Sequence, residues 1–132
     1  MTIVVGYVPR PEGRAALRRG VAEALLRDEN LLVLNAARGD AYADAGFASE
    51  EELAAVRAEL NQSGATFELR QVVRGVDPAD EIVDATKSVA DLIVIGIRHR
   101  TPVGKLILGS TAQRVVLEAR CPVLAVKADP TG

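Results

Sequence analysis

The strongest constraint on the fold is an alternation of short apolar runs with longer segments whose apolar residues recur at helical spacing. The apolar runs are predicted to be strands, and they cover residues 2–7, 30–36, 66–73, 92–96 and 122–127. The segments between them are predicted to be helices, at residues 12–27, 49–62, 77–88 and 109–119. A strict order of strand and helix predicts an α/β fold with a doubly wound parallel sheet.

The length and composition agree with this fold. Residues 1–132 are enough for one domain with a sizeable core, and we see no linker or repeat in the sequence. Apolar residues make up 48% of the chain and aromatic residues only 3%, so the core must consist of Val, Leu, Ile and Ala. The run at 66–73 alternates apolar and polar residues at first, which predicts an edge strand.

Local signals place several helix ends. Ser49 followed by Glu52 is a capping box, and Gly64 is expected to end that helix. Asp77 before Pro78 predicts another helix start. The acidic residues of this helix have mixed spacing, so caps and a solvated face explain them better than a catalytic carboxylate pair.

The charge and cysteine content narrow the possible environments. A net charge of −2 gives no general attraction to nucleic acid or to an anionic membrane. No apolar run approaches the roughly 20 residues of a membrane span, and the start of the chain lacks a signal-peptide pattern, so we expect a cytoplasmic protein. The single cysteine, Cys121, excludes an internal disulfide and is expected to be a buried structural thiol.

The segment 91–111 contains the candidate binding site. An apolar strand ends at Gly96, the basic residues Arg98, His99 and Arg100 follow, and a helix is predicted to start at 109–111. Glycine permits close backbone approach, and the free N–H groups of a helix start attract anions. The alternative is a plain strand-to-helix connection with glycines for tight packing and solvated basic side chains. In a doubly wound sheet, residues 8–11 and 96–109 could form the two lips of a pocket.

Motifs of several enzyme classes are absent from the sequence. No G-x-G-x-x-G follows the first strand, no G-x-S-x-G occurs, and Leu106 stands where a P-loop requires Ser or Thr. His99 is the only histidine, which rules out a multi-histidine metal site, and no Ser and carboxylate are clearly placed around it. We therefore expect neither a catalytic site nor a metal site.

Gly96, Gly109 and Ser110 are in register with the nucleotide loop of the universal stress protein family, which has the form Gly, two residues, Gly, nine residues, Gly, Ser/Thr. Residues 75–82, 90–96, 109–116 and 121–126 also resemble that family, so the resemblance covers essentially the whole chain. It implies strand order 3-2-1-4-5 with helices on both faces, an ATP-type ligand in some members, and homodimers that pair through the last strand, from Pro122 to Lys127.

The resemblance also implies site residues. Phosphates would lie over Gly96, Gly109, Ser110 and Thr111, with Ile95 beneath the sugar. The backbone at 35–37, around Ala36, would face adenine, and Val8 and Pro9 would lie at the other lip. Tyr7 beside them is expected to pack rather than to stack on a ligand.

Two departures from the family pattern affect this site. His99 replaces the middle glycine of the loop, where it either blocks close approach or donates to phosphate with help from Arg98. The sequence Val8-Pro9-Arg10 stands where nucleotide binders have an Asp followed by a small residue, so a carboxylate that could meet the ribose, the base or a metal is missing.

Two functions therefore stay open. The first is a stress-response regulator that binds ATP, ADP or AMP, with or without Mg²⁺. The second is a non-nucleotide-binding dimeric module that acts through protein partners. An apolar edge strand at 122–127 favours pairing with a second copy in either case. The sequence leaves open whether residues 38–49 cover the pocket.

Overall fold

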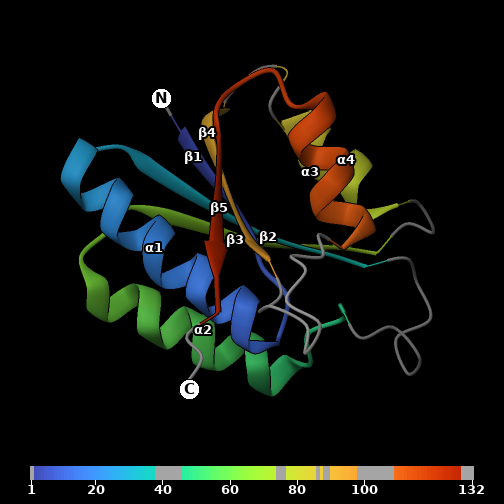
Figure 1. Cartoon of the computed structure of the whole chain (residues 1–132). Helices are drawn as coiled ribbons and strands as arrows, with labels where there is room; N and C mark the ends of the chain where they lie inside the picture. The colour runs from blue at the N-terminus through green and yellow to red at the C-terminus, as the bar shows by residue number, and fades with distance from the viewer. Residues whose placement is uncertain are drawn as a thin grey trace.

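The computed structural model describes residues 2–37, 46–73, 77–85, 87, 90–97 and 109–128. Its strands form one parallel sheet in the order β3-β2-β1-β4-β5, which confirms the predicted fold (Figure 1). The elements in chain order are β1 (Thr2–Gly6), α1 (Pro11–Arg27), β2 (Asn30–Ala37), α2 (Glu50–Ser63), β3 (Phe67–Val73), α3 (Pro78–Ala85), β4 (Ala90–Ile97), α4 (Ser110–Glu118) and β5 (Val123–Lys127).

Helices cover both faces of the sheet. The helices α1 and α2 lie on one face, and α3 and α4 lie on the other (Figure 1). The side chains of β4 alternate between two core clusters: Val94 packs with α1 and α2, whereas Ile93 and Ile95 pack with α3 and α4. Burial on both faces explains why the central strands are continuous apolar runs rather than alternating ones.

The predicted helix signals are present in the structure. The Ser49 hydroxyl accepts from the Glu52 amide, and the Glu52 carboxylate accepts from the Ser49 amide, which completes the capping box. Gly64 ends α2 at a φ of 85°, a conformation that glycine adopts without strain. Asp77 Oδ1 accepts from the Ala79 amide at 2.9 Å and caps α3. The helix α3 is shorter than predicted, because it ends at Ala85 and is followed by a turn at residue 87.

The sheet edges also match the prediction for residues 66–73. The strand β3 lies at one edge, and most of its side chains are partly or fully exposed. At the other edge, β5 carries half-exposed apolar residues. Cys121, just before β5, is half-buried rather than fully buried, and burial raises the pKa of its thiol. The thiolate, which is the reactive form of a cysteine, is therefore disfavoured.

The helix α1 lies unusually close to β1 and β4. A Cβ at Gly13 would overlap the backbone of Val8, and a Cβ at Gly96 would overlap the carbonyl of Glu12. These two glycines let the first turn of α1 press against the carboxyl ends of β1 and β4. None of the helices among the described residues is long and apolar enough to cross a membrane.

Candidate functional site

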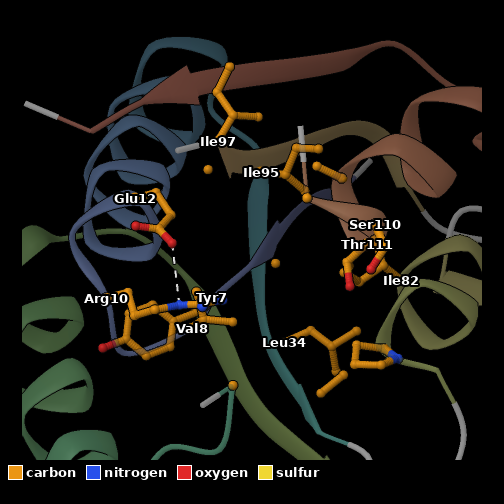
Figure 2. Close-up of a pocket in the computed structure, with 17 residues that line it drawn as sticks. Tyr7, Val8, Arg10, Glu12, Leu34, Ile82, Ile95, Ile97, Ser110 and Thr111 are labelled. Atoms are coloured by element: carbon orange, nitrogen blue, oxygen red, sulfur yellow. Dashed lines mark ion pairs between the residues drawn. The ribbon is translucent and has the colours of Figure 1, made fainter. Parts of the chain in front are cut away.

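A pocket of about 270 Å³ opens at the carboxyl ends of β1, β2 and β4 (Figure 2). This is the point where the strand order reverses, since β1 is flanked by β2 and β4, and ligands of doubly wound sheets bind there. The pocket is lined by Gly6, Tyr7, Val8, Arg10, Glu12, Leu34, Ala36, Gly46, Pro78, Ile82, Ile95, Gly96, Ile97, Gly109, Ser110, Thr111 and Ala112.

The floor of the pocket is apolar. Leu34 and Ala36 reach it from β2, Ile95 and Ile97 from β4, and Ile82 from α3. All five are at least 95% buried in the fold. Removing the face of a flat ring from water against such a surface is favourable, whereas an ionic group would be poorly solvated there.

One wall of the pocket is the start of α4. Gly109 is the N-cap residue of this helix. Because glycine has no side chain, it cannot accept a hydrogen bond from the first backbone N–H groups of α4. The hydroxyl residues Ser110 and Thr111 follow directly and line the pocket (Figure 2). Free amides at a helix start, next to hydroxyl donors, form a site for an anion of phosphate size.

The other wall carries a charge pair that the sequence analysis did not place in the site. Arg10 Nε lies 3.3 Å from Glu12 Oε1, and the Glu12 side chain is only 12% exposed (Figure 2). Arg10 Nε is buried and makes no hydrogen bond of good geometry within the described part of the chain, so the pair keeps hydrogen-bonding capacity. The available signal was position: Glu12 lies in the first turn of the helix that follows β1.

The predicted site residues divide into three groups. Pro9 is not among the lining residues, although its neighbours Val8 and Arg10 are. Arg98 and His99 lie outside the described residues, as does most of the segment 38–49. The predicted residues that line the pocket are Val8, Ala36, Ile95, Gly96, Gly109, Ser110 and Thr111.

The two glycines of the predicted loop have different surroundings. Gly96 has no room for a Cβ because the first turn of α1 lies directly against it, so tight packing accounts for glycine there. A Cβ at Gly109 would meet nothing within 4 Å among the residues that the structure describes. Free space at Gly109 permits a ligand to approach the backbone closely.

Two further residue groups are structural. Arg114 on α4 forms ion pairs with Asp77 at 3.2 Å and with Asp80 at 2.6 Å, so these carboxylates join α3 to α4. Tyr7 is 4% exposed and belongs to the core, as expected, and burial raises the pKa of its hydroxyl. No group of three or more metal-binding side chains occurs in the described ranges.

The comparisons with known proteins agree with one another. The family model of the "Universal stress protein family" matches residues 1–127. A universal stress protein of Mycolicibacterium smegmatis is 58% identical over 126 residues, which are 95% of this chain and 96% of the relative. The solved universal stress protein of Archaeoglobus fulgidus has a TM-score of 0.77 at 34% identity, covering 96% of this chain and 97% of that one.

A second solved structure contains a nucleotide. It is the universal stress protein from Archaeoglobus fulgidus in complex with dAMP, with a TM-score of 0.69 and 28% identity over 96% of both chains.

Proposed function

Because this chain belongs to the universal stress protein family, we propose that it is a stress-response protein that binds an adenine nucleotide in the pocket at the switch point. The observation that carries this proposal is the apolar floor beside the uncapped start of α4. The apolar floor suits a nucleotide base, and the N–H groups at the start of α4 suit a phosphate. The dAMP complex of a relative that covers the same length supports the adenine class.

The lining residues suggest how the nucleotide would bind. The α-phosphate accepts hydrogen bonds from the first amides of α4 and from the Ser110 and Thr111 hydroxyls. The ribose lies over Ile95, and the base lies against Val8 and Ala36. These roles are the ones that the resemblance to the family implies, and Val8, Ala36, Ile95, Ser110 and Thr111 all line the pocket.

Glu12 fills the role of the carboxylate that is missing at Val8. It reaches the pocket from the first turn of α1 rather than from the end of β1, and it is nearly buried. A carboxylate accepts hydrogen bonds from the ribose hydroxyls, while Arg10 balances its charge. In this proposal Glu12 compensates for one of the two departures from the family pattern, the missing carboxylate at Val8, whereas the other departure, His99, lies outside the described residues.

We propose binding without turnover. The described lining residues include one carboxylate, Glu12, whose charge Arg10 balances and which this proposal assigns to the ribose. Phosphoryl transfer requires positioned cations and a group that orients the nucleophile. A regulator that reads nucleotide binding fits these lining residues better than a hydrolase or a kinase.

The edge strand β5 supports a second role, homodimer formation. Val123, Leu124 and Val126 are half-exposed on β5, whose outer edge is not paired with another strand of the described sheet. An unprotected apolar edge pairs readily, and a second copy in two-fold symmetry is the simplest partner. This dimer would serve both a nucleotide-binding protein and a partner-binding module.

Calorimetry on the purified protein tests the first role. We expect ATP, ADP or AMP to bind with a micromolar Kd, and runs with and without Mg²⁺ show whether the ion takes part. No binding at millimolar nucleotide would overturn the proposal and favour the interaction module.

Light scattering tests the second role independently. A dimer at micromolar concentration that dissociates on Val126→Lys supports pairing through β5. A monomeric wild-type protein would refute it.

A further inference from the structure

The side chain of Asn35 is fully buried, yet its amide is completely hydrogen-bonded. Its Nδ2 donates to the carbonyl of Tyr7 at 2.9 Å and to the carbonyl of Gly46 at 2.7 Å. Its Oδ1 accepts from the amide of Ala48 at 3.2 Å and from Gln71 Nε2 at 2.9 Å. Two donors meet two carbonyls and the oxygen meets two donors, so only one orientation of this amide fits.

Gln71 on β3 completes this network. Its Nε2 also donates to the carbonyl of Ala48 at 2.8 Å. Both the N–H and the C=O of Ala48 are therefore held by side chains, and the carbonyl of Gly46 is held as well. Residues 46–48 lead into the capping box of α2, so the network connects β1, β2, β3 and the approach to α2.

The network lies directly behind one side of the pocket. Tyr7 and Gly46, whose carbonyls Asn35 holds, both line the pocket. On β2, Leu34 and Ala36 belong to the core cluster of α3 and α4 and line the pocket, so Asn35 between them points to the opposite face. The hydrogen bonds therefore fix the pocket side that lies away from the start of α4.

Burying a side-chain amide in the core costs free energy, because the amide loses its hydrogen bonds to water. A leucine, which has the same number of side-chain heavy atoms, would avoid the cost of desolvation, whereas a fully satisfied polar network selects one backbone arrangement. We infer that Asn35, supported by Gln71, is a positioning residue that holds the Tyr7 and Gly46 carbonyls at the base-side wall of the pocket and fixes Ala48 behind that wall. This inference rests on the proposed nucleotide function and adds how the base is selected.

The substitution Gln71→Glu tests it with little risk to folding. Gln71 is exposed, and glutamate keeps its size but removes the donor to Asn35 Oδ1 and to the Ala48 carbonyl. The new carboxylate would repel both oxygens, so the wall should shift. Gln62→Glu makes the same chemical change on the exposed side of α2, away from the pocket, and is the matched control.

Titrations with AMP and with ribose 5-phosphate, followed by NMR chemical shifts, separate the base from the phosphate. In Gln71→Glu we expect AMP to bind about tenfold more weakly, the equivalent of one net hydrogen bond. Ribose 5-phosphate and the control variant should change less than about twofold, within the usual effect of a surface substitution. A merely structural role would weaken both ligands together.

Hydrogen exchange provides a second readout that needs no ligand. Asn35→Leu removes the donors to Tyr7 and Gly46 and the acceptor of the Ala48 amide, so the Ala48 amide should exchange faster, while amides within α2 keep their protection. Unchanged Ala48 exchange, or equal losses for AMP and ribose 5-phosphate, would overturn the inference. If wild-type protein binds ribose 5-phosphate as tightly as AMP, the adenine proposal and the base-side wall both fail. Tight AMP binding that Gln71→Glu leaves intact refutes the inference alone.

Discussion

The pocket has an α4 wall, formed by Gly109, Ser110 and Thr111, and an α1 wall, formed by Arg10, Glu12 and the adjoining Gly96. The glycines of these two walls have different surroundings. The α1 wall is part of the core: Gly96 and Gly13 are packed so closely that a single added carbon would overlap backbone. The α4 wall is the start of a helix, where a carbon added at Gly109 meets none of the described atoms within 4 Å. Close packing therefore requires glycine in the α1 wall, whereas glycine in the α4 wall leaves space for a ligand.

This difference predicts that the same substitution has opposite consequences on the two walls. Gly96→Ala should destabilise the protein by about 3 kcal/mol, the upper part of the overpacking range, because the overlap involves backbone atoms of Glu12 that cannot rotate away. Gly109→Ala should cost no more than about 1 kcal/mol, the usual value of an N-cap change. Urea unfolding of the two variants measures both. Equal losses would mean that the walls are not distinct.

The substitution Ser110→Ala tests whether the α4 wall binds the phosphate. If the Ser110 hydroxyl donates to a charged phosphate, AMP should bind about 2 kcal/mol more weakly, close to thirtyfold in Kd. Adenosine, which lacks the phosphate, is the control ligand and should bind the variant as it binds the wild type. A similar loss for adenosine would place Ser110 away from the phosphate.

The substitution Glu12→Gln tests whether the α1 wall binds the ribose. The neutral amide is a weaker acceptor for the ribose hydroxyls, so AMP affinity should fall by about 1 kcal/mol, roughly fivefold. The 2′,3′-dideoxy analogue of AMP has no hydroxyl for this contact, and its affinity should not fall. Calorimetry with the two ligands measures both affinities. If both affinities fell equally, Glu12 would contribute to packing and not to binding of the ribose hydroxyls.

The comparison also shows what the sequence can predict. The fold follows from local patterns: apolar runs, helical spacing, the capping box at Ser49 and the stop at Gly64 all act within a few residues. The start of α4 was predicted from the Gly109-Ser110-Thr111 sequence ahead of residues with helical spacing, and the structure has Gly109 at the N-cap. The edge position of β3 followed from its alternating pattern.

The α1 wall could not be predicted in the same way. Glu12 lines the pocket because Gly13 and Gly96 bring α1 and β4 together, and these glycines are far apart in the sequence. The partners of Asn35 come from three separate segments, so an asparagine in an apolar strand carried no local signal of its role. Such contacts depend on how the elements pack, which one-dimensional patterns do not contain.

The central claim is that a nucleotide places its phosphate against the start of α4. Gly109→Val tests it most directly, because a Cβ added at Gly109, which lines the pocket, has no contact within 4 Å among the described residues beyond its chain neighbours. The account predicts micromolar AMP binding by the wild type, loss of that binding in calorimetry of the variant, and unfolding free energies within about 1 kcal/mol of each other. A stable Gly109→Val variant that binds AMP as tightly as the wild type would contradict it.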